Sequence, residues 1–151
     1  MGKLNLSYQN LNKALKTLKK AILAFNDIEK LKSWNEENKL QFSNYEDMRD
    51  QLRDSTTQRF EYCTDLFWKY LKNYLEFYLH KPVEISSPKM VIKTACKTEM
   101  ISESDTTKLI NMIKDRNETS HIYKEEMAED LIVKIPEYYK LMHKYAAILT
   151  P

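Results

Sequence analysis

Residues 56–77 read TTQRFEYCTDLFWKYLKNYLEF, and within this stretch small or aromatic side chains recur at alternating spacings of four and three. This spacing places them along one face of an α-helix. The stripe consists of Thr56, Phe60, Cys63, Phe67, Tyr70, Tyr74 and Phe77. We therefore predict that a helix from about Tyr45 to Leu79 is the longest segment of the chain and buries this stripe.

Similar stripes occur on both sides of this segment. One comprises Leu4, Tyr8, Leu11, Leu15, Leu18, Ile22 and Phe25, and another comprises Ala128, Leu131, Ile135, Tyr138, Met142, Tyr145 and Leu149. The N-terminal stripe suits either an antiparallel bundle or an intermolecular coiled coil, and the matching stripes favour the bundle. Residues 35–44 read as a polar connection, Ser87 and Pro88 begin a short helix, and Leu109, Met112 and Ile113 mark a fourth.

The composition supports the same architecture. Of 151 residues, 42% are hydrophobic, one is glycine and four are proline, which favours helices over tight hairpins. We predict one domain, residues 1–151, folded as an all-α, antiparallel (up-and-down) bundle of about five helices. Pro136 interrupts the last stripe, so that segment is either one kinked helix or two helices.

Charge and cysteine content exclude several classes of protein. A formal charge of +2 is too small to predict nucleic-acid binding from bulk charge alone. Cys63 and Cys96 lack a disulfide framework, and no apolar run suits a signal peptide or a membrane span, so a cytoplasmic protein is expected. Three scattered histidines and two distant cysteines give no metal-ligand spacing, and no metal is predicted in this chain.

Residues 115–123 read DRNETSHIY and combine the side chains that phosphodiester cleavage uses. Arg116 carries a planar, permanently charged fork for phosphate oxygens, and His121 titrates near neutral pH. Asn117 can hydrogen-bond one imidazole nitrogen and so fix the tautomer. We predict that His121 is a general acid or base and that Arg116 stabilises charge on the phosphoryl oxygens.

The spacing of these residues raises a geometric problem. In a straight helix Asn117 and His121 share a face, whereas Arg116 and His121 lie roughly 140° apart. Either Arg116 curls round, or the helix frays, or two copies meet across a twofold axis and form a composite site. The twofold arrangement is favoured.

The order Arg116, Asn117, His121 and Tyr123 resembles the signature of the HEPN superfamily of helical RNases and nucleotide-binding domains. A second motif, Asp54 to Tyr62 followed by Trp68 and Lys69, resembles the long helix of its nucleotidyltransferase substrate-binding subfamily. The two motifs occur in the family's order and span much of the chain.

The resemblance implies a homodimeric toxin that cuts RNA and is neutralised by a minimal nucleotidyltransferase antitoxin. It also implies that this partner transfers AMP from ATP to Tyr123, which would put a bulky negative group beside the site and exclude RNA. ATP and Mg are expected on the partner, and no cofactor is expected in this chain.

A polar stripe, Asp54, Gln58, Glu61 and Asp65, runs along the long helix beside the buried one. It is either solvated or lines the cleft against residues 116–123, in which case Asp54 and Glu61 support the site. A carboxylate from this helix is one candidate partner for Arg116, which continues an apolar stripe. Arg59 could likewise pair with a carboxylate and support the site.

Lys89, Lys93 and Lys97 fall four apart on one face of the short helix. They form either a solvated face or a track that binds the phosphate backbone of RNA.

Two other functions are compatible with this sequence. The bundle could be a non-catalytic subunit that presents substrate or nucleotide to a separate nucleotidyltransferase, with Arg116 holding a phosphate. It could also be a structural adaptor that binds partners through its N-terminal stripe.

Overall fold

The computed structural model describes residues 2–38, 45–80, 82–83, 87–121 and 124–151, and the side chains of residues 33–38, 120 and 121 lie outside this description. The chain forms five helices there: α1 Gly2–Asn38, α2 Tyr45–Leu79, α3 Pro88–Lys97, α4 Glu103–His121 and α5 Glu125–Ile148. No strand occurs among these residues. The all-α prediction is therefore confirmed.

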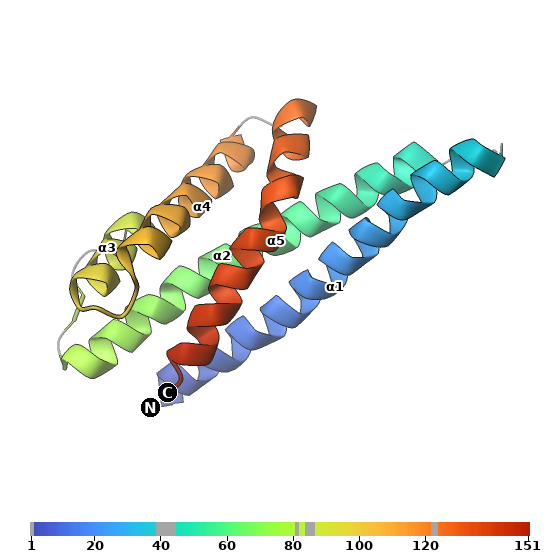
Figure 1. The fold of residues 1–151 in the computed structure, drawn as a ribbon. Coiled ribbons are helices and arrows are strands. Elements are labelled where there is room, and N and C mark those ends of the chain that lie inside the picture. Colours follow the sequence, from blue (N-terminus) through green and yellow to red (C-terminus); the bar gives the residue numbers. More distant parts are fainter. Residues whose placement is uncertain (1, 39–44, 81, 84–86, 122–123) are drawn as a thin grey trace.

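Figure 1 shows α1 and α2 as a long antiparallel pair, with α5 packed across both and with α3 and α4 along the other side of α2. The N and C termini lie at the same end of the bundle. Because α2 contacts each of the other four helices, it is the central element of the fold.

The stripe that predicted α2 is buried over most of its length. Phe60, Cys63, Phe67 and Tyr70 are all 0% exposed, and Tyr74 and Phe77 are partly buried against the same core. The stripes of α1 and α5 contribute to one continuous hydrophobic cluster with them. Within this chain, the N-terminal stripe therefore packs into the core of the antiparallel bundle.

Local signals set several helix ends. The hydroxyl of Ser102 accepts a hydrogen bond from the backbone N–H of Asp105 at 3.2 Å, which caps α4. His80, directly after α2, has a positive φ of 53°, the left-handed conformation that often ends a helix.

Three expectations are corrected or resolved. The longest helix is α1 with 37 residues, against 35 for α2. The polar stretch expected to be a connection from residue 35 is helical as far as Asn38, because polar residues can continue a helix whose apolar stripe is already anchored. Pro136 lies inside α5, which is a single helix from Glu125 to Ile148.

None of the helices in the described part of the chain combines the length and the apolar character that crossing a membrane requires.

Candidate functional site

Arg116 contacts α2 through a two-pronged ion pair with Asp65. Its Nε donates to Oδ1 at 3.1 Å and its Nη2 donates to Oδ2 at 3.0 Å. These hydrogen bonds to Asp65 raise the pKa of Arg116, which stays fully charged. The expected carboxylate partner from the long helix is therefore found. Asp65 occupies one edge of the guanidinium, and the Nη1 edge has no partner among the described residues.

A second contact joins the same helices one turn further along. The hydroxyl of Thr119 lies 3.1 Å from the Oε1 of Glu61 and 2.8 Å from the carbonyl oxygen of Arg116. Glu61 and Asp65 thus face α4 and are not simply solvated. The stripe is therefore divided: Glu61 and Asp65 line the face toward residues 116–119, as one interpretation predicted, whereas Gln58 is exposed to solvent.

The helix through the motif does not end before His121, which is the last residue of α4. Asn117 and His121 therefore keep their places one turn apart on one face. The side chain of His121 lies outside the described residues, as does the whole of Tyr123. Asn117 is exposed and lines a pocket between α3, α4 and the start of α5, whereas Arg116 points to α2. One chain thus divides the motif between two faces.

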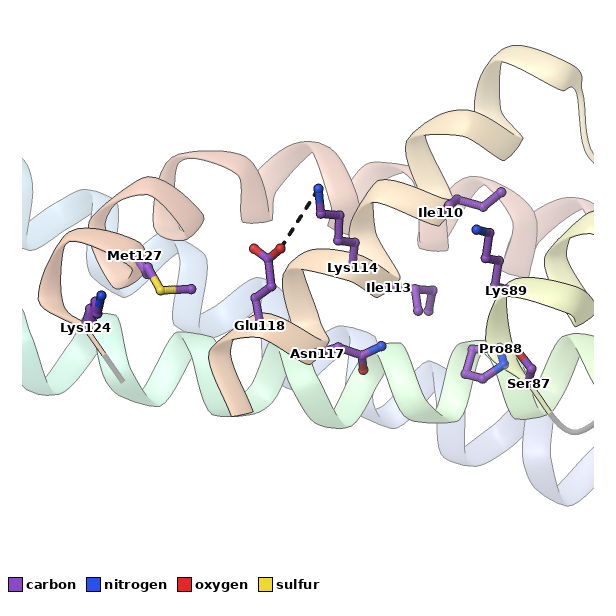
Figure 2. Close-up of a pocket in the computed structure, with 10 residues that line it drawn as sticks. All are labelled: Ser87, Pro88, Lys89, Ile110, Ile113, Lys114, Asn117, Glu118, Lys124 and Met127. Carbon is purple, nitrogen blue, oxygen red and sulfur yellow. Dashed lines mark ion pairs between the residues drawn. The ribbon is translucent and has the colours of Figure 1, made fainter. Parts of the chain in front are cut away.

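The pocket beside Asn117 has a volume of about 640 Å³ and lies between α3, α4 and the start of α5. Figure 2 shows Asn117 directed from α4 toward the start of α3, with Ile113 beside it. Ile110, Ile113 and Met127 provide apolar lining. The remaining lining residues are Ser87, Pro88, Lys89, Lys114, Glu118 and Lys124.

The two remaining supporting residues lie in different surroundings. Asp54 accepts a hydrogen bond from the Nε of Arg53 at 3.1 Å. Arg59 is exposed, and its Nη1 donates to the carbonyl oxygen of Thr17 in α1 at 3.1 Å. The partner of Arg59 in the structure is thus a backbone carbonyl of α1, whereas the sequence suggested a carboxylate.

The sequence analysis did not predict an ion-pair cluster that joins α1, α2 and α5, in which Arg53 is buried and Glu129 is partly exposed. Arg53 is 3% exposed and donates to Glu129 at 2.8 Å, while Arg49 binds both oxygens of Glu129 at 2.5 and 2.7 Å and also binds Glu29. The hydrogen bonds from Arg49 are the largest cause that lowers the pKa of Glu129 to about 2. Arg49 and Arg53 lie four apart on one face of α2, a signal that could have identified the cluster.

The lysines of α3 match the predicted face. Lys89, Lys93 and Lys97 are all exposed. Lys89 also lines the pocket beside Asn117. Within the described part of the chain, no group of three or more His, Cys, Asp or Glu side chains could hold a metal ion.

Comparison with known proteins identifies structural relatives. A protein of Thermus thermophilus superposes with a TM-score of 0.70 and 28% identity, covering 93% of this chain and 99% of its own. A structure described as a toxin-antitoxin with AMP-PNP superposes with a TM-score of 0.60 over 93% of this chain and 97% of its own, and at 12% identity it shows a shared fold. No curated protein matches the chain.

A family model described as nucleotidyltransferase substrate binding protein like matches residues 6–150. The match spans nearly all of the five-helix bundle and includes both sequence motifs, the one in α2 and the one at the end of α4. The chain belongs to the nucleotidyltransferase substrate-binding protein family.

Proposed function

We propose that this protein is a HEPN-type toxin that cuts RNA without a metal ion and is neutralised by a partner nucleotidyltransferase. The observation that carries the proposal is the ion pair of Arg116 with Asp65, which holds the guanidinium by one edge and leaves Nη1 for a phosphate. A toxin-antitoxin structure with the same fold supports the assignment to this class.

The proposed reaction uses the 2′-hydroxyl of RNA as nucleophile. This hydroxyl loses its proton and attacks the adjacent phosphorus, the P–O5′ bond breaks, and O5′ takes up a proton. The products are a 2′,3′-cyclic phosphate and a 5′-hydroxyl. His121 carries one of these two protons, Asn117 orients His121, and Arg116 stabilises the charge on the phosphoryl oxygens. DNA has no 2′-hydroxyl and is not cut.

We infer a homodimer from the division of the motif between two faces. Arg116 points to α2, whereas Asn117 and His121 occupy another face of α4, so a site built across a twofold axis brings the two sets together. Mixing Arg116→Ala and His121→Ala chains tests this arrangement. Heterodimers then hold one complete site, and cleavage recovers to roughly a quarter of the wild-type rate. Two dead variants that stay dead after exchange of subunits contradict the composite site.

The test of the activity is cleavage of labelled tRNA and messenger RNA by the purified, partner-free protein in EDTA. Wild type and His143→Ala, a control at an exposed histidine of α5, are expected to cut RNA. His121→Ala is expected to cut at a rate lower by about 10²-fold or more. Equal rates for wild type and His121→Ala contradict the assignment.

Neutralisation is proposed to occur through Tyr123. The partner transfers AMP from ATP to the Tyr123 hydroxyl and releases pyrophosphate, with ATP and Mg bound by the partner. The AMP group then competes for the arginine that RNA needs. Intact mass of the chain co-expressed with its partner is expected to rise by one AMP group mapped to Tyr123. An unmodified Tyr123 in fully neutralised protein contradicts this step.

A second function is favoured by the family description itself, which names substrate binding. In that case the bundle presents a nucleotide or other substrate to a separate nucleotidyltransferase, and Arg116 holds a phosphate without cleavage. RNA binding that Arg116→Ala abolishes, in a wild-type protein that cuts nothing, distinguishes this function from the toxin.

A further inference from the structure

The pocket between α3, α4 and α5 combines an apolar floor with cationic ends. Ile110 and Ile113 come from α4 and Met127 from α5, so three aliphatic side chains from two helices line its middle. Its volume of about 640 Å³ falls within the roughly 300–1,000 Å³ typical of small-molecule sites. The pocket is therefore large enough for a ligand with a flat apolar part.

The charges around this pocket favour an anionic ligand. Lys89 lies at one end, Lys124 at the other, and Lys114 on the wall between them, as Figure 2 shows. Among the described lining residues, Glu118 is the acidic one, and its Oε1 lies 4.0 Å from the Nζ of Lys114. These residues, three lysines and one glutamate, carry a net positive charge, and the cations at the two ends can each bind a phosphate.

The start of α3 adds to this positive field. Ser87 is the N-cap residue and Pro88 occupies the first turn, and the side chain of Ser87 does not cap the helix. The first-turn N–H groups of a helix and its dipole favour a negative group. Ser87, Pro88 and Lys89 all line the pocket, so this contribution acts on the same volume.

We propose that this pocket binds a nucleotide, with the base on the floor of Ile110, Ile113 and Met127 and with phosphate at Lys89 and Lys124. Asn117 lines the same pocket on α4. The choice of a nucleotide among anionic ligands rests on the proposed function, because Asn117 lies one turn from His121 on the same face of α4. The pocket would then hold the nucleotide next to the phosphate that is cut.

Nuclear magnetic resonance of isoleucine and methionine methyl groups tests this site directly. The probe is AMP, added to the His121→Ala chain so that no chemistry interferes, and inorganic phosphate is added in a parallel titration. AMP is expected to shift the methyl signals of Ile110, Ile113 and Met127 and to bind more tightly than phosphate, because the floor contributes to affinity. Silent pocket methyls, or equal affinity for phosphate and AMP, overturn the proposal.

Charge-reversal variants sharpen the result. Lys89→Glu and Lys124→Glu are each expected to weaken AMP binding by about tenfold. Lys108→Glu is the matched control, because Lys108 is an exposed lysine of α4 outside the pocket lining. A loss of affinity in Lys108→Glu as large as that in Lys89→Glu would assign the binding to bulk charge and overturn the site.

A short RNA titrated in the same way identifies the source of the nucleotide. If the RNA shifts the pocket methyls at lower concentration than AMP does, the ligand is an RNA strand, and if AMP binds more tightly, it is a free nucleotide. The experiments separate a wrong pocket assignment from a wrong RNase assignment. A wild-type protein that cuts no RNA but binds AMP in the pocket loses the RNase assignment alone, and one that cuts RNA with silent methyls loses the pocket alone.

Discussion

Arg53 and Arg116 both bind carboxylates, but their surroundings differ. Arg53 is 3% exposed, and its guanidinium contacts Glu129 of α5 together with two carboxylates of its own helix. Arg116 is 22% exposed, and Asp65 is the carboxylate that forms an ion pair with it among the described residues. Removing a buried partner costs far more than removing an accessible one. The comparison indicates that Arg53 holds helices together and that Arg116 keeps part of its guanidinium accessible to a ligand.

The largest effect on stability is expected for Arg53→Ala. This change removes the buried cation of the cluster and its hydrogen bonds to carboxylates, while Arg49 still binds Glu129, so we expect a loss of about 1.5–3 kcal/mol of unfolding free energy. Urea denaturation followed by circular dichroism measures the loss. Arg59→Ala is the control, because Arg59 is an exposed arginine of the same helix, and its cost is expected to stay within about 0.5 kcal/mol. Equal costs for the two variants would remove the structural role of Arg53.

Arg116→Ala is expected to show the opposite profile. Its unfolding free energy changes by about 1 kcal/mol or less, because a partly exposed ion pair contributes little. Its RNA cleavage falls by about 10²–10³-fold, because charge on the phosphoryl oxygens loses its stabilising cation. Cleavage kinetics and urea denaturation on the same preparation separate the two quantities. A variant that unfolds easily and still cuts RNA would reverse the roles assigned to the two arginines.

Asp65→Asn tests whether the ion pair positions Arg116. The neutral amide can no longer hold both Nε and Nη2, so the fork loses its fixed direction, and kcat is expected to fall about tenfold with KM nearly unchanged. Glu76→Gln is the control, since Glu76 is a partly buried carboxylate near the other end of α2 that pairs with Lys72. Unchanged kcat in Asp65→Asn would show that Arg116 needs no support from α2.

The smallest of these effects is a pH dependence of stability that belongs to the Arg53 region. The pKa of Glu129 is lowered from 4.5 to about 2, so its contribution to stability is fully present above pH 4.5 and is lost as the pH falls toward 2. Thermal unfolding from pH 7 to pH 2 measures this loss. Glu129→Gln is expected to reduce the fall of the melting temperature between pH 4.5 and pH 2. Glu137→Gln, at an exposed carboxylate of α5, is expected to leave this fall as in wild type. If the melting temperature of Glu129→Gln falls with acid as steeply as that of wild type, the ion pairs of Glu129 do not contribute to stability as proposed.

The helices were predictable because the chain repeats one physical signal. Apolar side chains at spacings of three and four mark α1, α2 and α5, and Ser87 with Pro88 marks the start of α3. The end of α1 was misjudged because residues 35–38 are polar, and a polar helix end has no periodic signature. The partners of Arg116 and Arg53 also differ in how far the sequence reveals them. Asp65 lies on a polar stripe that the spacing of α2 reveals, and this stripe suggested a carboxylate partner for Arg116. The spacing of Arg49 and Arg53 marks a basic face of α2, but it does not identify Glu129, 76 residues from Arg53, as their shared partner.

A metal-independent RNase site on α4 is tested most directly by the chemical nature of the RNA ends that wild type and Arg116→Ala produce in EDTA. We expect fragments with 2′,3′-cyclic phosphate and 5′-hydroxyl ends from wild type and almost none from Arg116→Ala, although both chains are folded. Equal yields of fragments from the two chains, or no fragments from wild type, would contradict the claim that α4 carries a metal-independent RNase site.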